Sequence, residues 1–390
     1  MKKVFLFFIT FLGLCCVVLA QSNPNPGTIT GDSLRPITTA VPFLTITPDA
    51  RAGAMGDAGV ATSADANSVH WNPAKLAFID TDIGFSLSYT PWLGKIIDDM
   101  SIAYLSGYYK LSKEEAIAVS MKYFDLGEIF FTNSTGGSEG DFNPRELAID
   151  ATYSRKLSQN LGIGITGRYI HSNLTGSFSS STGGGIEARP GNSVSADIAM
   201  YYNKDISLGG RNSNLAFGAN ISNIGAKLTY SDENNRDFIP TNLRIGTALT
   251  TDLDPYNKIT FALDLNKLMV PSPRLDSTQN EKSLLSGMFG SFGDAEDGFS
   301  EELREFTLSL GAEYWYNNTF AVRLGYFLED EDKGNRKYLT AGVGFRYQKF
   351  GVDFAYLVPQ EQEHPLAETL RFSLLFNFDK SIQDEESVTD

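Results

Sequence analysis

The sequence predicts an all-β fold, a 14-stranded antiparallel transmembrane β-barrel whose lumen holds an N-terminal plug. Three observations predict it. Segments of roughly ten residues that alternate apolar and polar side chains follow one another from Asp82 onward. The connections between these segments alternate between short and long. The segment before them, residues 48–79, is rich in glycine and alanine and has almost no large apolar side chain, so it cannot form a core of its own.

The chain begins with the features of a secretory signal peptide, which we assign to residues 1–20. Two lysines precede an apolar run, and Val18-Leu19-Ala20 is a cleavage site of the small-x-small type. Cys15 and Cys16 are the two cysteines of the sequence, and both leave with the signal. We therefore expect a mature chain without disulfides or cysteine-based metal sites.

The composition excludes one class of partner. The formal net charge of −15 becomes −17 when the two lysines of the signal are removed, which excludes a nucleic-acid-binding surface. After the signal, no stretch is apolar over the roughly 18 residues that a spanning helix needs, so we expect no transmembrane helix. An acidic soluble β-sheet protein and an outer-membrane barrel both fit these values.

The strand pattern favours the barrel. In residues 83–89, 147–153 and 161–165, large apolar side chains alternate with glycine, serine, threonine or aspartate. The second segment, which ends before Leu111, alternates poorly. Lengths of about 9–11 residues suit strands that cross a membrane at a tilt. We expect an N-terminal segment and plug over residues 21–81, the barrel over residues 82–378, and an acidic periplasmic tail over residues 379–390.

The connections support the same assignment. A closed barrel in the outer membrane has tight periplasmic turns and longer external loops, and an even number of strands places both termini in the periplasm. A soluble β-sandwich, the alternative, has no reason for this alternation. The short connections lie near residues 111–113, 156–160, 317–318 and 348–349, and the long ones near residues 129–145, 172–192, 225–241, 268–305 and 358–368.

The two faces of the strands differ in chemistry. The outward face is apolar, with tyrosine and tryptophan near strand ends, as expected where a barrel meets lipid headgroups. These aromatic residues are Tyr89, Trp92, Tyr108, Tyr123, Tyr169, Tyr202, Tyr314, Tyr316, Tyr326, Tyr347 and Tyr356.

The inward face carries six basic and five acidic side chains. Buried charges persist when they are paired or hydrated, so we expect a network that fills the lumen and braces the plug. A selective ion path is the alternative, although neither sign dominates. The residues are Lys122, Asp150, Arg168, Asp197, Arg244, Asp264, Glu313, Arg323, Arg346, Asp353 and Arg371.

The plug region carries a family resemblance. The sequences ARAGAMGDAGVA and SVHWNPAKLAF resemble the N-terminal signature of the FadL-like outer-membrane barrels, in which an N-terminal segment forms a hatch in the lumen. Residues 43–57 and 218–225 more closely resemble the PorV family, the outer-membrane component of the type IX secretion system of Bacteroidota. The signature residues are Arg51, Gly53, Gly56, Gly59, Asn72 and Pro73.

The resemblance implies a secretion role rather than an enzyme. It implies that the barrel binds C-terminal signal domains of exported cargo as cargo leaves a large translocon barrel. It also implies transfer of cargo to attachment machinery that includes a sortase-like protein. The other expected surroundings are outer-membrane lipid, with no nucleic acid. A FadL-type transporter of hydrophobic small molecules is the first alternative, and a surface enzyme is the second.

Other motifs give weak indications of chemistry, so we expect no cofactor, metal or catalytic site. Residues 162–167 match GxGxxG but lie within an alternating strand rather than before a helix. His70, His171 and His364 are far apart in the sequence, and a Ser–His–Asp triad would have to use His171 or His364. The acidic runs 294–305 and 329–332 lack calcium-loop spacing, and we expect solvated loops there.

Two long connections carry aromatic residues that an external loop would expose at a cost. Phe289, Phe292 and Phe299 lie in the connection at residues 268–305, and Phe130 and Phe131 lie in the connection at residues 129–145. These five residues are candidates for partner contact. Packing back against the barrel is the alternative.

Overall fold

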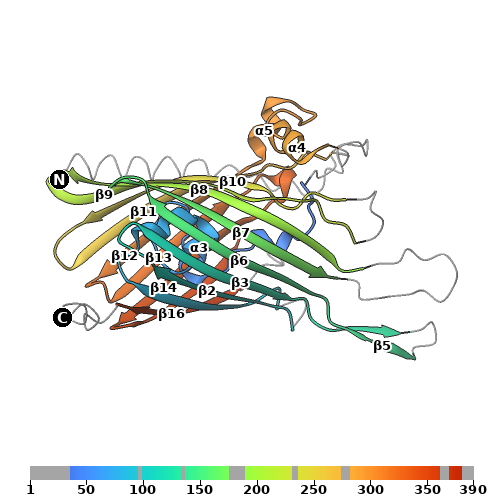
Figure 1. Ribbon diagram of the computed structural model, residues 1–390, viewed down its shortest axis with the longest axis horizontal. Helices are drawn as coiled ribbons and strands as arrows, with labels where there is room; N and C mark the ends of the chain where they lie inside the picture. The colour runs from blue at the N-terminus through green and yellow to red at the C-terminus, as the bar shows by residue number, and fades with distance from the viewer. Residues whose placement is uncertain are drawn as a thin grey trace, which may run out of the picture. The chain divides into compact units, whose positions relative to one another are not determined.

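The chain folds into a closed β-barrel of fourteen antiparallel strands (Figure 1). The computed structural model describes residues 36–94, 99–132, 137–174, 189–230, 236–273, 282–360 and 369–379. The expected signal peptide, His364 and all of the acidic tail after Asp379 lie outside the described residues. The strands pair in sequence order, and the first strand, β1, closes the barrel on the last, β16. The predicted fold class is confirmed.

The strands and helices have the following bounds. The barrel strands are β1 (Ile83–Pro91), β2 (Ser101–Lys110), β3 (Glu115–Asp125), β6 (Arg145–Lys156), β7 (Leu161–Asn173), β8 (Gly191–Leu208), β9 (Arg211–Gly225), β10 (Asn242–Asp252), β11 (Asn257–Leu268), β12 (Phe306–Tyr316), β13 (Phe320–Leu328), β14 (Lys337–Tyr347), β15 (Phe350–Pro359) and β16 (Leu370–Phe378). The helices are η1 (Pro42–Thr45), α2 (Ala50–Gly53), α3 (Ser68–Trp71), η2 (Pro73–Phe78), α4 (Leu284–Gly290), α5 (Phe299–Arg304) and η4 (Glu331–Lys333).

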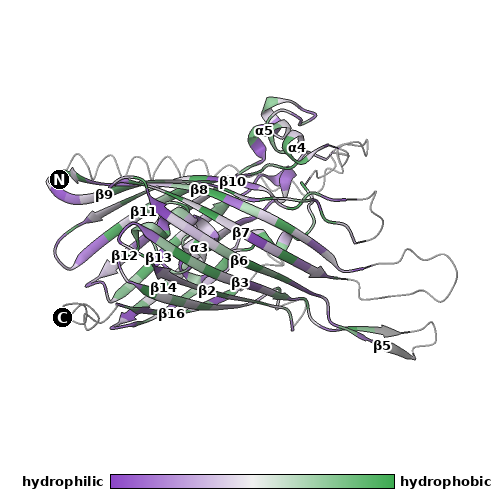
Figure 2. Cartoon of the chain, in the orientation of Figure 1, coloured by the Kyte–Doolittle hydropathy of each residue, from purple (hydrophilic) through white to green (hydrophobic). Residues whose placement is uncertain are grey.

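Alternation along the strands separates a lipid-type outer face from a buried inner face. In β1, Phe85 and Leu87 are exposed on the outside, whereas Ser86 and Ser88 are buried. Hydrophobic and hydrophilic residues alternate along most of the strands (Figure 2). This arrangement is the inverse of a soluble protein, because the apolar side chains face away from the interior. None of the helices within the described residues is long and apolar enough to cross a bilayer.

The second strand departs from this rule, and the departure corrects two of the predicted outward aromatics. Tyr104 and Tyr108 of β2 point inward and are 1% and 3% exposed. Tyr108 packs with Val69 and Leu76 of the N-terminal segment. Trp92, which follows β1, packs against a buried cluster rather than facing outward. The strand is apolar on both faces because its inner face meets the segment in the lumen, which explains its poor alternation in the sequence.

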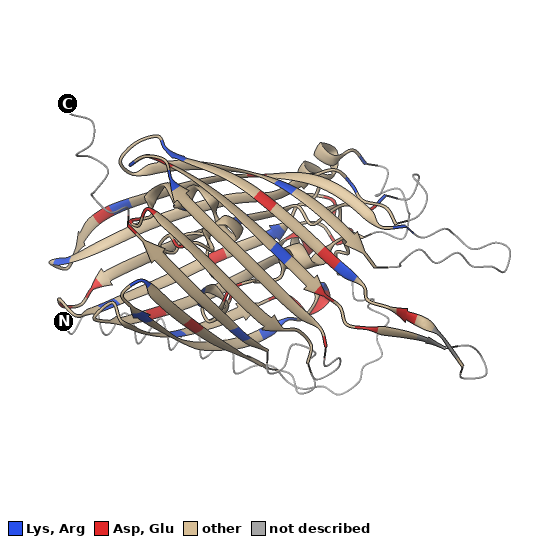
Figure 3. Ribbon diagram, turned by 60° about the horizontal axis from the view of Figure 1, so that its bottom comes forward, with Lys and Arg blue, Asp and Glu red and all other residues tan. Residues whose placement is uncertain are grey.

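The two ends of the barrel differ. Tight turns join the strands at one end, such as Gly209-Gly210 between β8 and β9, where both glycines have positive φ. Here β8 and β9 are longer than expected, at 18 and 15 residues. Longer connections lie at the other end, together with α4, α5 and a hairpin of β4 (Ile129–Thr132) and β5 (Ser138–Phe142) (Figures 1 and 3). We call this the loop end; the sequence did not predict the hairpin.

Candidate functional site

The plug segment, residues 48–79, contacts the barrel wall at the level of the backbone. A Cβ at Gly325 of β13 would lie 1.9 Å from the nitrogen of Gly56. Conversely, a Cβ at Gly56 would lie 2.5 Å from the nitrogen of Tyr326. Gly56 also has a φ of +65°, which favours glycine. Because glycine lies on both sides, the plug segment and β13 approach more closely than any side chain would allow.

The other signature glycines also mark close contacts. A Cβ at Gly53 would lie 2.7 Å from Nη1 of Arg371, and one at Gly59 would lie 2.4 Å from the ring of Trp71. Gly162 and Gly164 of the GxGxxG match face the plug segment, and a Cβ at Gly164 would lie 2.5 Å from the nitrogen of Ala74. The motif therefore gives room for the plug segment.

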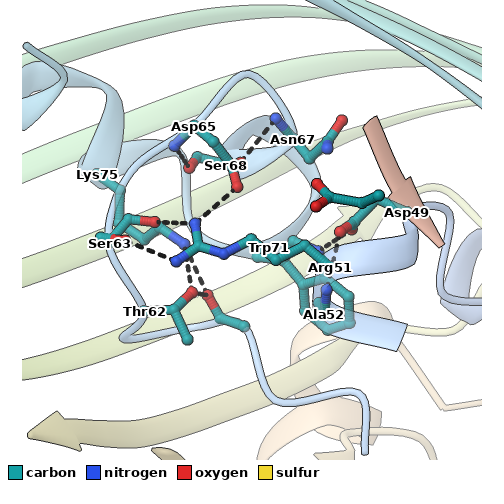
Figure 4. A network of polar contacts seen from close by, with 12 residues as sticks. Asp49, Arg51, Ala52, Thr62, Ser63, Asp65, Asn67, Ser68, Trp71 and Lys75 are labelled. Atoms are coloured by element: carbon teal, nitrogen blue, oxygen red, sulfur yellow. Dashed lines mark hydrogen bonds and ion pairs between the residues drawn. The ribbon is translucent and has the colours of Figure 1, made fainter. Parts of the chain in front are cut away.

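Arg51 links the plug segment to the wall. Its guanidinium donates two hydrogen bonds to Glu313 of β12, at 2.8 and 3.0 Å, and another to Asp65 at 2.9 Å. It also bonds the carbonyl and hydroxyl oxygens of Ser63 (Figure 4). All five N–H groups of a guanidinium are donors, and four of these bonds are to side chains or backbone on two different parts of the chain. Arg51 thus fixes the fold of the plug segment and its position together.

The network continues around the wall from Glu313. Arg323 of β13 donates to Glu313 at 2.7 Å and to Asp353 of β15 at 2.8 Å. Asp353 also accepts two hydrogen bonds from Arg346 of β14, at 2.6 and 2.9 Å. Charges alternate in sign along this path, so each buried carboxylate faces two arginines. Basic and acidic side chains are interspersed over the strands rather than gathered by sign (Figure 3).

A second cluster lies on the side of β6 to β8. Arg168 bonds Asp150 at 2.7 Å and Asp197 at 3.0 Å, and it also donates to Asn223. Lys122 of β3 has no carboxylate partner among its hydrogen bonds and donates instead to the carbonyl oxygens of Leu44 and Ile46. These carbonyls belong to the N-terminal segment, so this lysine is also a tether.

Three of the predicted inward residues meet the plug segment in other ways. Asp264 of β11 accepts hydrogen bonds from the backbone nitrogens of Gly59 and Val60, at 2.7 and 2.8 Å. Arg371 of β16 lies 3.6 Å from the carboxylate of Asp57. Arg244 of β10 lies over the ring of Trp71, 4.6 Å from its centroid.

Asn72 and Pro73 form the turn that ends the plug segment's second helix. The side chain of Asn72 accepts from the nitrogen of Ala74 at 3.0 Å, which caps η2, and Pro73 follows at the first helical position. The same amide donates to the carbonyl oxygens of Val60 and of Met200 on β8. One side chain therefore joins two stretches of the plug segment and the wall.

Several contributors within the plug segment were missed by sequence reasoning. Asp49 caps α2 through the nitrogen of Ala52 and accepts from the indole of Trp71 at 2.6 Å. Burial, together with the nearby Asp65, raises the pKa of Asp49 to about 6. Burial lowers the pKa of Lys75 to about 8, and its ammonium donates to the carbonyl of Gly59. An aspartate directly before a helical stretch is a capping pattern that could have identified Asp49.

The acidic run at residues 294–305 is not the solvated loop that the sequence predicted. Glu302 and Glu305 are buried and form ion pairs with Lys267 of β11. Lys333 of η4 bonds Glu301 at 2.6 Å and Glu305 at 3.1 Å. This correction has a plain cause: the two lysines come from other parts of the chain, so a local sequence pattern could not reveal them. The cluster fixes α5 to the barrel.

The aromatic candidates at the loop end are exposed. Phe289 is 68% exposed, Phe299 is 76% exposed and Phe130 is 69% exposed. Phe292 is 43% exposed, and the side chain of Phe131 lies outside the described residues. Together with two exposed leucines, three of these residues form the loop-end aromatic surface of α4 and α5, which consists of Leu285, Phe289, Phe292, Phe299 and Leu303.

The described residues contain no group of three or more His, Cys, Asp or Glu side chains arranged to hold a metal ion. His70 is buried in the plug segment, with its ring edge-on to Trp71. His171 bonds Asn192 near the end of β7. His364 lies outside the described residues.

These features define a class of protein: an outer-membrane β-barrel whose lumen is filled by its own N-terminal segment and whose long connections gather at one end. Residues 30–275 match the family described as "Type IX secretion system protein PorV", which is more than half of the chain. The chain belongs to this family. The family is one of secretion-system components, and no curated protein outside it matches this sequence.

Several solved barrels are similar in structure. The toluene transporter TodX of Pseudomonas putida is 11% identical, with 88% of this chain and 98% of that chain covered and a TM-score of 0.48. The toluene transporter TbuX of Ralstonia pickettii is 12% identical, with coverage of 85% and 98% and a TM-score of 0.45. A FadL homologue of Pseudomonas aeruginosa is 10% identical, with coverage of 89% and 100% and a TM-score of 0.43.

Proposed function

We propose that this barrel is a non-enzymatic subunit of type IX secretion that binds the C-terminal signal domains of exported cargo. In this proposal it receives cargo from a large translocon barrel and passes it to surface attachment machinery that includes a sortase-like protein. Both termini would lie in the periplasm, at the end with tight turns, and the loop end would face outward.

The observation that carries the proposal is the loop-end aromatic surface. Phe289 and Phe299 are more than two-thirds exposed, and burying such rings against a partner is favourable. The buried ion pairs of Lys267 and Lys333 hold the helical segment in place, so little order is lost on binding. Aromatic side chains on a rigid support are typical of interface anchors.

Deletion of the gene tests the role in the cell. Cargo with C-terminal signal domains should accumulate in the periplasm, and normal secretion would contradict the proposal. For the surface, we expect the double substitution Phe289→Ser and Phe299→Ser to weaken cargo capture by at least tenfold, since an interface anchor contributes about 2 kcal/mol. Tyr256→Ser is the matched control, because Tyr256 is 62% exposed but lies in a tight turn.

A FadL-type transporter of hydrophobic small molecules is the second candidate. It would require an apolar path past the plug segment. The ion pairs of Arg51 and the backbone contact between Gly56 and Gly325 oppose displacement of that segment. Lost uptake of hydrophobic compounds in the deletion strain, with normal secretion, would favour the transporter instead.

A further inference from the structure

A cavity of about 770 Å³ lies above the plug segment, on the side of the loop end. Asp57 and Trp71 of the plug segment contribute to its lining, together with side chains of β10, β11, β13, β14 and β16. Residues 36–47 and the connections after β1 and β13 complete its lining. The barrel therefore keeps a chamber between the plug segment and its long connections.

The chamber has one positive charge in excess. Four cationic side chains and three carboxylates line it, namely Arg244, Lys333, Arg336 and Arg371, and Asp57, Glu305 and Glu329. Two of the cations are satisfied by direct hydrogen bonds: Lys333 bonds Glu305 at 3.1 Å, and Arg336 bonds both carboxylate oxygens of Glu329 at 2.7 Å. The other two cations, Arg244 and Arg371, are not matched in this way.

Arg371 is only loosely paired. It is 3% exposed, and its nearest carboxylate oxygen, on Asp57, is 3.6 Å away, which is beyond hydrogen-bond range. Its Nε has no hydrogen-bond partner among the described residues. Asp57 accepts a hydrogen bond from the hydroxyl of Tyr338 instead.

Arg244 is the cation in excess. It is 7% exposed and forms no ion pair with any residue in the described part of the chain. Its Nε donates to the amide oxygen of Asn266 at 2.7 Å, and its guanidinium lies over the ring of Trp71. A buried guanidinium without a carboxylate is unfavourable by several kcal/mol unless something else neutralises it. Its Nη groups are the donors left to meet that something.

We propose that Arg244, with Arg371 beside the same chamber, forms a binding site for a carboxylate carried on a partly apolar molecule. A single excess charge suits a monoanion, and a guanidinium binds the two oxygens of a carboxylate in parallel. The chamber is far larger than a carboxylate alone, and Ile37, Leu93 and Leu268 supply apolar lining for the rest of the molecule. An aliphatic acid and the free end of a peptide chain share this chemistry.

Ligand titration of the purified full-length protein in a non-ionic detergent tests the site. Two of the three tryptophans, Trp71 and Trp92, line the chamber, so intrinsic fluorescence reports occupancy. The probes are hexanoate and an N-acetylated Ala-Val-Val tripeptide with a free carboxylate, each compared with its carboxamide. We expect at least one carboxylate to bind and its carboxamide to bind at least tenfold more weakly; the one that binds identifies the source. Equal binding of acid and amide, or binding of neither acid, would overturn the proposal.

Two variants place the effect at Arg244. Arg244→Gln should weaken carboxylate binding at least tenfold. Asn266→Asp keeps the arginine but gives it an internal carboxylate, so it should also abolish binding while the barrel folds. Arg155→Gln, which breaks an exposed ion pair on β6, is the control and should bind as the unaltered protein does. Unchanged affinity in Arg244→Gln or in Asn266→Asp would overturn the site. These readouts need no cargo, so they can fail while the proposed function stands, and the reverse also holds.

Discussion

Glu313→Gln is the most direct test of how the plug segment is held. Glu313 is 2% exposed and accepts hydrogen bonds from Arg51 of the plug segment and from Arg323 of β13. The substitution keeps the volume of the side chain but removes the charge between two buried arginines. Breaking a buried ion pair from one side costs 3–5 kcal/mol in typical cases. Each arginine retains one other carboxylate, so we expect a loss of about 3 kcal/mol, near the lower end of that range.

The assay is the free energy of unfolding in urea, measured on the barrel in detergent micelles by the gel mobility of folded and unfolded forms. A loss of about 3 kcal/mol changes the unfolding equilibrium by more than a hundredfold. Glu115→Gln is the matched control, because Glu115 pairs with Arg155 at 3.5 Å on the exposed surface and such pairs contribute about 0–1 kcal/mol.

Combining Glu313→Gln with Arg51→Gln shows whether the effect passes through this contact. The two losses should not add, with a coupling energy of at least about 1 kcal/mol. A loss below about 1 kcal/mol for Glu313→Gln, equal to the control, would refute the view that ion pairs hold the plug segment.

Two further predictions concern the same segment. Gly325→Ala should destabilise the barrel by about 3 kcal/mol, because its Cβ would lie 1.9 Å from the backbone of Gly56. Gly167→Ala, which has open space at this position, should change the free energy of unfolding by less than about 1 kcal/mol, and a similar loss in both would contradict the steric argument. Burial lowers the pKa of Lys75 to about 8 from 10.5, so the folded form releases this proton first and stability should rise between pH 8 and 10.5. Lys75→Met should lack that part of the rise in urea titrations at pH 8 and 10, and an identical pH dependence in both proteins would contradict it.

The strands were predictable because a barrel wall has two solvents. Alternation is strict where lipid lies outside and polar side chains lie inside, as at Phe85 and Ser86. It fails in β2, where Tyr104 and Tyr108 point inward, because the N-terminal segment offers an apolar surface within the lumen. No pattern within β2 contains that information.

The charged residues show a similar division. Parity alone placed Arg168, Glu313 and Arg323 on the inner face, since a charge on the lipid side is costly. Their partners depend on strand register and on the path of the plug segment, so the sequence did not pair Arg51 with Glu313. The same reason hid the contact between Glu305 and Lys333, which lie 28 residues apart.

One serine bears on the order in which this molecule is assembled. Ser373 of β16 accepts a hydrogen bond from the nitrogen of Ala50 at 2.9 Å, and its hydroxyl also bonds that of Ser88 on β1 at 2.7 Å. The first strand, the last strand and the plug segment thus meet at one point on the seam. The contact at the seam can form only when the early part of the chain is already in the lumen. Insertion of the plug segment and joining of the seam are therefore steps of one event, and a barrel that joined its first and last strands around an empty lumen would lack both.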